Sequence, residues 1–335
     1  MKVLMLVSPK ERASLAQAPG LPAFDASQIR DHAADAHLCV LGNGEEIRSH
    51  CSLWWNEAPP MATHRIGAIG HYASVDDEAA GILLGAAARH LREKACTLAV
   101  GPMNGNTWRR YRFVTDAGPN GSAEPPFFLE PTNPPEWSRQ FEQAGFKPLA
   151  EYYSALNTNL DRRDERIALI AARLEELGVS IRSAQKADLR DQLKRIYGVS
   201  RIAFRRNFLY TELPEQAFVA QYLPLLDRIQ PELVLLAERD GDLLGYLFAI
   251  PDLAQAARGQ AIDTFIIKTV AILPESSHRG LGSLLVARAH QAGHHLGYTR
   301  AIHALMHEDN ISCNISNHYA AIMRKYTLYS RELEP

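Results

Sequence analysis

The sequence predicts a mixed α/β protein of the α+β class, built from two copies of one unit. Both halves can be divided into the same order of elements: strand, helix, hairpin, long strand, loop, helix, strand, helix and strand. The segment GILL at 81–84 aligns with GSLL at 282–285, and 146–153 takes the same place in its half as 322–329. A repeat on this scale predicts two domains of similar fold.

The repeat also predicts where the units begin and end. We place the first domain at 1–160, a linker helix at 161–178 and the second domain at 179–335. In the linker, apolar residues recur along one helix face, Asp161 can cap the start and Gly178 can stop the end. This single apolar face suits packing between the two copies.

The amino-acid composition indicates an ordinary globular protein. Hydrophobic residues make up 46% of the chain and charged residues 22%, which is ordinary for a globular protein. The net charge of -2 gives no reason to expect nucleic acid or an anionic membrane as a partner. No apolar run reaches the length of a membrane span, and the apolar start is too short for a signal peptide. We therefore expect a cytoplasmic protein, with its oligomeric state left open.

The cysteines predict neither disulfides nor a metal site. Cys39, Cys51, Cys96 and Cys313 are far apart and include no CxxC pair, so we expect reduced thiols and no zinc. Cys39 and Cys51 can face each other across a predicted hairpin, although buried small apolar residues are the interpretation we favour.

Alternation and turn residues predict the elements of both halves. In the first half, Gly42-Asn43-Gly44 joins two strands into a hairpin, and 76–93 is an amphipathic helix. The other expected elements of that half are strands at 2–7, 63–72, 97–100 and 146–156 and a helix at 136–144. In the second half we expect strands at 179–183, 233–238, 243–250, 261–273, 300–306 and 324–333, and helices at 188–197, 282–296 and 310–319.

Residues 104–137 are the least regular part of the chain. Residues 108–112, WRRYR, alternate arginine with aromatic residues, and a proline-rich loop follows. Such a segment can stack on a nucleotide base, or it can form an aromatic cluster packed under a long loop. The nearly neutral net charge favours the packed cluster.

The stretch 269–289, TVAILPESSHRGLGSLLVARA, is the most informative one. Its branched apolar residues at 270–273 suit a buried strand, which Pro274 ends. A polar turn with glycines follows, and from Gly282 the apolar residues fall at helical spacing. A loop that opens a helix presents free backbone N–H groups and partial positive charge, so the stretch predicts a site for a phosphate or pyrophosphate.

This stretch resembles the acyl-CoA-binding motif of the GNAT acetyltransferase superfamily. The motif is glutamine or arginine, two free positions, glycine, any residue, then glycine or alanine; Gly280 and Gly282 fit its small positions, and Ser277 stands where glutamine or arginine is usual. The element order is that of the GNAT fold, so the chain resembles a tandem GNAT protein. The resemblance implies two domains, each with a central, mostly antiparallel sheet flanked by helices. It also implies an N-acyltransferase that moves an acetyl group from acetyl-CoA to a primary amine.

The resemblance implies which residues hold the acetyl-CoA. The backbone of Val270, Ala271 and Ile272 would pair with the pantetheine arm, and an N–H group there would stabilise the oxyanion of the thioester. Asn310 would contact the pantetheine. The pyrophosphate would be held by the loop residues Ser277, His278, Arg279, Gly280, Leu281, Gly282 and Ser283.

Catalysis also needs a proton donor for the leaving thiolate and a neutral amine. By resemblance, Tyr319 would be the general acid, with Tyr326 as the alternative. We assign no general base. His303, His307 and Glu308 lie on or just after the preceding strand, but a chain of waters can replace a dedicated base.

The first copy differs at the corresponding loop. Asp76, Asp77 and Glu78 stand in place of the glycines, and three carboxylates would repel a pyrophosphate. We therefore expect one CoA per chain, and a first copy that shapes the acceptor cleft. Two other functions stay open: a non-catalytic CoA-binding or regulatory protein, and a first copy that binds a partner. The acceptor itself depends on loops that carry no motif.

Overall fold

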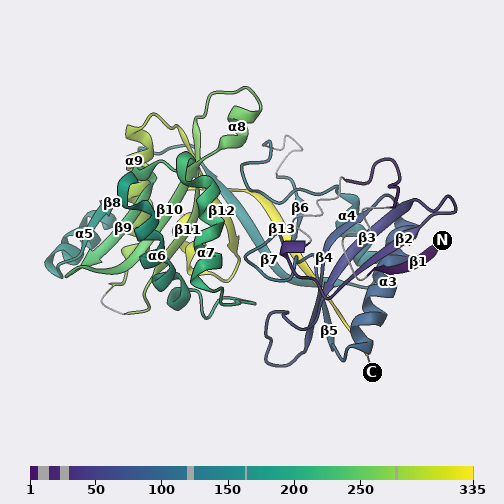
Figure 1. Ribbon diagram of the computed structural model, residues 1–335. Coiled ribbons are helices and arrows are strands. Elements are labelled where there is room, and N and C mark those ends of the chain that lie inside the picture. The colour runs from purple at the N-terminus through teal and green to yellow at the C-terminus, as the bar shows by residue number, and fades with distance from the viewer. Residues whose placement is uncertain (7–14, 23–29, 119–123, 163, 276–277, 335) are drawn as a thin grey trace.

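The computed structural model describes the chain except residues 7–14, 23–29, 119–123, 163, 276–277 and 335, and the side chains of Ile311 and Ser312. Its strands form one continuous sheet through both halves (Figure 1). From one edge to the other the order is β1 (Lys2–Leu6), β2 (Ala36–Leu41), β3 (Ile47–Trp54), β4 (Ile66–Ser74), β5 (Leu98–Gly101), β13 (Ala321–Glu332), β7 (Lys147–Asn157), β12 (Arg300–His307), β11 (Thr264–Ile272), β10 (Asp242–Pro251), β9 (Val234–Arg239) and β8 (Ser180–Ser183). A further strand, β6 (Phe113–Asp116), pairs with β13 beside this path.

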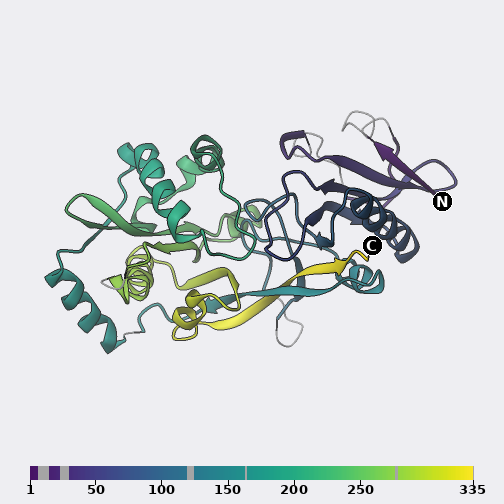
Figure 2. The ribbon, with the colours of Figure 1, turned by 90° about the horizontal axis from the view of Figure 1, so that it is seen from below.

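The two halves exchange their last strands. β7, at the end of the first half of the sequence, pairs with β12 of the second half, with Leu156 opposite Ile302. β13, near the end of the chain, reaches into the first half and pairs with β5, with Tyr329 opposite Gly101. β7 and β13 also pair with each other, and Figure 2 shows them side by side across the middle of the molecule. Each half of the sequence therefore contributes a strand to the sheet of the other half.

Helices cover both faces of the sheet in the second half and one face in the first. They are α3 (Asp77–Glu93), α4 (Glu136–Gln143), α5 (Glu165–Glu176), α6 (Leu189–Ala203), α7 (Glu215–Tyr222), α8 (Leu253–Ala257), α9 (Leu281–His295) and α10 (Ile311–Ser316). On β9, Leu235 packs with the core under α5 and α9, whereas its neighbour Leu236 packs with the core under α6 and α7. In the first half α3 and α4 cover one face, and the other face meets Leu209 of the second half.

Most of the expected elements are confirmed, including the hairpin of β2 and β3, helix α3 and the strand–loop–helix of β11 and α9. The linker helix differs from the prediction in two ways. It begins at Glu165 and is capped by Asp164 rather than Asp161. It also packs on α9 inside the second half, through Leu174, rather than between the halves. Helix α10 ends at Ser316, so Tyr319 lies beyond the helix on which it was expected.

The four cysteines, all of them among the described residues, are buried, and the structure joins none of them in a disulfide. In the hairpin, Cys39 lies opposite His50 and Cys51 opposite Leu38, so Cys39 and Cys51 do not face each other. Their shared role is that of small apolar residues in the core of the first half.

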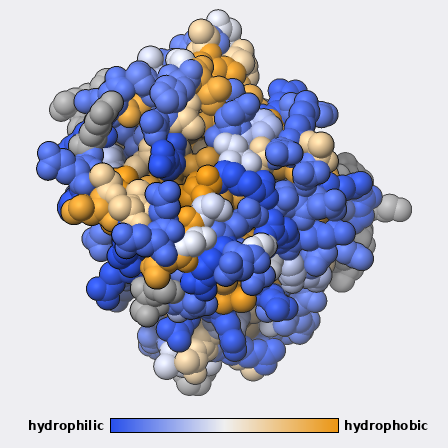
Figure 3. All heavy atoms as spheres, turned by 90° about the vertical axis from the view of Figure 1, so that its left-hand side faces the viewer, coloured by the Kyte–Doolittle hydropathy of each residue, from blue (hydrophilic) through white to orange (hydrophobic). Residues whose placement is uncertain are grey.

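The outer surface of the second half is mostly hydrophilic, with apolar side chains in separate groups (Figure 3). Leu169 on α5 is the most exposed of the large apolar side chains, at 75%. Within the part of the chain that the structure describes, no helix combines the length and the apolar character needed to cross a bilayer.

Candidate functional site

The site begins where two neighbouring strands separate. β11 and β12 run parallel and are paired only from Thr264 with Arg300 to Ile267 with His303. Beyond Ile267, β11 continues to Ile272 and is paired with β10 alone, so its other edge faces the gap. An extended ligand can pair with such an edge as an added strand would.

A bulge lies at the point of separation. Ile267 pairs with Ala249 and Thr269 with Phe248, which leaves Lys268 between them without a partner on β10. A bulge redirects the side chain and leaves its residue outside the regular ladder of hydrogen bonds. The gap between β11 and β12 therefore begins beside the Lys268 side chain and the unpaired backbone of the bulge.

A cavity of about 1090 Å³ adjoins this gap, and we call it the central cleft. Both halves line it. The first half contributes 107–112 and 129–132 from irregular segments, and Tyr152 from β7. The second half contributes 267–270 of β11 and 303–307 of β12, together with aromatic residues from α7 and the segment after α6. The cleft thus combines the separated strands of the second half with a wall from the first.

The N-terminus of α9 has no side-chain cap among the described residues. Gly280 precedes the helix with a φ of 84°, a left-handed conformation that favours glycine. The first turn also carries no acidic residue. Because the first N–H groups of a helix lack acceptors within it, this helix end suits an anion such as a pyrophosphate.

The predicted loop residues lie around this helix start. Ser277 is outside the described residues. His278 is buried, and neither ring nitrogen has a hydrogen-bond partner among the described residues, although a Glu275 carboxylate oxygen lies 3.7 Å from Nε2. The Arg279 side chain is exposed, and its carbonyl accepts a hydrogen bond from Arg173 of α5. The linker helix therefore supports the loop from outside.

Gly282 lies in the first turn of α9 and faces β11. A Cβ at this position would meet Cδ1 of Ile315 at 3.3 Å and Cγ1 of Val270 at 3.8 Å. Leu281 is buried in the core beneath α9, and Ser283 is half-buried. The glycine keeps a space free between α9, β11 and α10.

The strand residues predicted to meet the pantetheine point in different directions. Val270 and Ile272 both pack against the core under α9, and Val270 also lines the central cleft, whereas Ala271 packs with the core under α6. Asn310 also lines the cleft, and its backbone N–H donates to the carbonyl of His307 just before α10. Val270 and Asn310 are therefore in one cleft, while Ala271 points its side chain to the opposite face of the sheet.

The two candidate acids lie in different places. Tyr319 does not line the cleft; its ring packs edge-on against His290, and its buried hydroxyl has no partner among the described residues. Tyr326 is fully buried on β13, where its hydroxyl donates to Glu130 and lies 3.0 Å from Oγ of Ser154. Burial raises the pKa of both tyrosines. Tyr326 is connected to the cleft through the carboxylate of Glu130, whereas Tyr319 is connected to it through His290 and His303.

The two histidines of β12 both line the cleft but differ in their surroundings. His303 stacks on His290 with ring nitrogens 2.9 Å apart, and burial lowers the pKa of His303 to about 4. His303 is therefore neutral at pH 7. His307 is half-buried, lines the cleft and packs edge-on against Tyr152. Glu308 is exposed and does not line the cleft.

The segment 108–112 forms a packed aromatic cluster, which confirms the interpretation we favoured. Trp108 meets the rings of Phe204 and Tyr210 edge-on, and its indole N–H donates to the carbonyl of Thr211. The cluster joins the two halves at one end of the cleft.

Sequence reasoning missed a group of charged residues at the base of the cleft. The Arg112 guanidinium lies between the rings of Tyr111 and Tyr152, 4.1 and 4.2 Å from their centroids. Near it are Lys268 and Glu130. Burial, with the neighbouring Arg112, lowers the pKa of Lys268 to about 8. Arg112, Glu130 and Lys268 come from three separate segments of the chain, so no local sequence pattern could have predicted that they lie close together.

The start of α3 in the first copy differs from the start of α9. Asp76 caps α3 by accepting a hydrogen bond from the Ala79 N–H, and it pairs with Arg48. Asp77, in the first turn, pairs with Arg139. The helix start is thus occupied by the chain's own carboxylates, as the sequence led us to expect.

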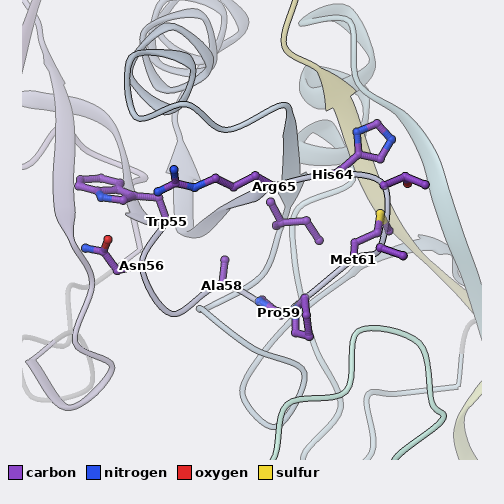
Figure 4. Close-up of a pocket in the computed structure, with 11 residues that line it drawn as sticks. Trp55, Asn56, Ala58, Pro59, Met61, His64 and Arg65 are labelled. Atoms are coloured by element: carbon purple, nitrogen blue, oxygen red, sulfur yellow. The ribbon is translucent and has the colours of Figure 1, made fainter.

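A second cavity of about 610 Å³ lies in the first half, beside the loop from Trp55 to Ile66 (Figure 4). Figure 4 shows the Arg65 side chain extending toward Trp55. One loop makes this cavity, and it brings together none of the predicted site residues. Nor do the described residues contain three His, Cys, Asp or Glu side chains grouped to hold a metal ion.

The chain is similar to known acetyltransferases, in one segment of its sequence and in its whole fold. A family model described as the acetyltransferase (GNAT) family matches residues 196–314, whereas no curated protein matched the sequence. A GCN5-related N-acetyltransferase from Sphaerobacter thermophilus has a TM-score of 0.51 at 12% identity, covering 99% of this chain and 96% of that one. A tandem GNAT protein from the clavulanic acid biosynthesis pathway has a TM-score of 0.52 at 12% identity, covering 100% and 99%.

A third similar structure is much longer than this chain. It contains a GCN5-related glucosamine N-acetyltransferase region in a fungal multi-domain GH3 β-N-acetylglucosaminidase, with a TM-score of 0.55 at 12% identity. The match covers 98% of this chain and 38% of the other. At such identities the likeness establishes the fold alone. The chain has a tandem GNAT fold, and its segment 196–314, which holds the separated strands and α9, matches the model of the GNAT acetyltransferase family.

Proposed function

We propose that the protein is an acyl-CoA-dependent N-acyltransferase that moves an acetyl group from acetyl-CoA to a primary amine. One observation carries the proposal: a helix start without a side-chain cap among the described residues lies next to Val270, on an unpaired strand edge that lines a large cleft. The helix start supplies hydrogen-bond donors for a phosphate. The free strand edge can pair with an extended ligand, and the cleft can admit an acceptor.

The donor would lie along the free edge of β11. Backbone N–H groups of 279–283, with Ser277 and His278 beside them, would hold the pyrophosphate. The pantetheine would pass the space kept free by Gly282 and pair with the backbone of 270–272, near Asn310. Its thioester would then reach the bulge at Lys268, where unpaired backbone can stabilise the oxyanion.

The acceptor would enter through the central cleft, with the first half forming one wall. The amine nitrogen attacks the thioester carbonyl carbon, the C–S bond breaks, and the CoA thiolate takes up a proton while the new amide nitrogen loses one. The four cysteines are buried and not joined in disulfides, which supports a reducing compartment, and we propose the cytoplasm.

Isothermal titration calorimetry on the full chain tests the donor site. We expect one CoA per chain, because within the described residues α9 has no side-chain cap, whereas Asp76 caps α3. Transfer from acetyl-CoA to a panel of primary amines tests the reaction. Binding without transfer would favour the alternative, a non-catalytic CoA-binding or regulatory protein. The absence of heat with millimolar CoA would contradict both.

Two tyrosine variants separate catalytic from structural roles. Tyr319→Phe should leave kcat within about twofold and the free energy of unfolding unchanged or slightly higher, because it removes a buried hydroxyl without a described partner. Tyr326→Phe should lower the free energy of unfolding by about 1–3 kcal/mol, because Glu130 and Ser154 each lose a partner. Denaturant unfolding and steady-state kinetics measure both. A hundredfold loss of kcat in folded Tyr319→Phe would instead assign that residue as the general acid.

A further inference from the structure

The lining of the central cleft holds an excess of positive charge, which is buried at Arg112 and half-buried at Lys268. Arg112 is only 6% exposed, and Lys268 lies on the bulge of β11. Within the described part of the chain neither forms an ion pair; the carboxylate that acts on Lys268 is Glu130. The side chain of Glu130 is itself buried and already has Nε of Arg324 at 3.2 Å. Lys268 and Arg324 therefore share the carboxylate of Glu130, and Arg112 adds a further positive charge beside Lys268.

This arrangement is costly without a further anion. Buried charges of like sign repel strongly, because the protein interior screens them less than water does. The Arg112 Nε has no acceptor among the described residues, and its Nη1 only reaches the carbonyl of Leu305 at 3.5 Å. Burial raises the pKa of Glu130, and protonation of this carboxyl would increase the excess of positive charge in the cleft. The other acid that lines the cleft, Asp309, is exposed and lies 4.0 Å from His307.

The guanidinium is also fixed in one orientation. The rings of Tyr111 and Tyr152 hold Arg112 between them, and the ring of Tyr326 lies 5.8 Å from it. A planar group held in this way is suited to binding an oxyanion through two parallel hydrogen bonds. Lys268 adds a point charge beside it, and a bound anion would restore the proton affinity that burial lowers.

We propose that the acceptor is a small amine that carries a carboxylate or phosphate group, and that Arg112 and Lys268 bind this anionic group. The inference rests on the proposed N-acyltransferase function and adds its substrate class. The anion lies at the base of the cleft beside the bulge, so the amine of the same molecule is held near the mouth of the gap where the thioester would lie.

Matched acceptor pairs test the inference on the full-length protein. Phenylalanine and phenethylamine differ by a carboxylate, and glucosamine 6-phosphate and glucosamine differ by a phosphate. Initial rates with acetyl-CoA give kcat/KM for each. The N-acetylated products of all four, titrated by calorimetry, give affinities that do not depend on turnover. In at least one pair we expect the anionic member to be favoured at least tenfold, and the pair that shows it tells carboxylate from phosphate.

Variants of Lys268 test whether its positive charge causes the preference for the anionic acceptor. Lys268→Met should reduce the preference to within about threefold, and Lys268→Arg should retain most of it. Lys325→Met, which removes an exposed lysine on β13, is the matched control and should keep the full preference. CoA affinity, measured by the same calorimetry, shows whether each variant keeps its donor site.

The outcomes separate this inference from the function on which it rests. CoA binding with equal use of both members of each pair overturns the anionic acceptor and leaves the N-acyltransferase standing. A preference unchanged in Lys268→Met, or no binding of any anionic acceptor or product at millimolar concentration, also overturns it. Failure to bind CoA overturns the proposed function itself.

Discussion

Gly282→Val should weaken CoA binding at least tenfold, or about 1.4 kcal/mol, and leave the protein folded. The new Cβ would lie 3.3 Å from Cδ1 of Ile315 and 3.8 Å from Cγ1 of Val270, and the two methyl groups of valine would fill the space between α9, β11 and α10. The fold tolerates this change, because the tightest contact is with the end of a flexible side chain and valine is a better helix residue than glycine. The proposed pantetheine path, however, would be blocked.

The chain itself supplies a matched control. Gly81 is the residue of the first copy that the sequence repeat aligns with Gly282; it lies further along its helix, α3, than Gly282 does in α9, and a Cβ there meets no atom within 4 Å. Gly81→Val should therefore leave CoA affinity unchanged. Calorimetry with CoA measures both variants, and thermal unfolding confirms that they are folded. Unchanged affinity in folded Gly282→Val would show that the glycine serves only the packing of the helix.

The features that could be predicted from the sequence are those encoded in short segments. The strand, turn and helix at 269–289 follow each other directly, so proline, glycine and helical spacing sufficed to place β11 and α9. Asp76 could be recognised at the start of α3 for the same reason. The local signal was weaker at Tyr319, because α10 is short and its end is not marked by glycine or proline.

Features that depend on distant segments could not be predicted in this way. The charge group of the cleft joins Arg112, Glu130 and Lys268, each from a different segment and none in a motif. The exchange of β7 and β13 was also invisible, because an apolar strand fits either of two similar sheets and its sequence does not say which neighbour it takes. The sequence repeat predicted two similar units. That the two units share strands is visible only in the pairing of β7 with β12 and of β13 with β5.

This sharing predicts that neither half is stable alone. The boundaries 1–160 and 179–335 remain our proposal for the repeated units, yet a chain of 1–160 lacks β13 and leaves the edges of β5, β6 and β7 unpaired. A chain of 161–335 lacks β7, the neighbour of both β12 and β13. Tyr326, Leu328 and Tyr329 of β13 are almost fully buried, and a large apolar side chain stabilises a fold by about 1.5–3 kcal/mol when buried. Losing several at once approaches the whole stability of a domain, about 5–15 kcal/mol.

We therefore expect 1–160 and 161–335, expressed separately, to be unfolded or aggregated, and to form a soluble complex when expressed together. A tag on one fragment should recover both in equal amounts, and the complex should bind CoA within about threefold of the intact chain, because the cut falls outside every strand and helix. The matched control is the same pair with 321–335 deleted; it should fail to assemble, because β13 is the strand that enters the first half. A monomeric 161–335 that folds alone and binds CoA as tightly as the full chain would contradict the prediction, since it would show that β7 is dispensable to the donor site. The structure argues against that result, because β7 is the strand that holds β12 on the side away from β11, and the gap between β11 and β12 needs both of its walls in place.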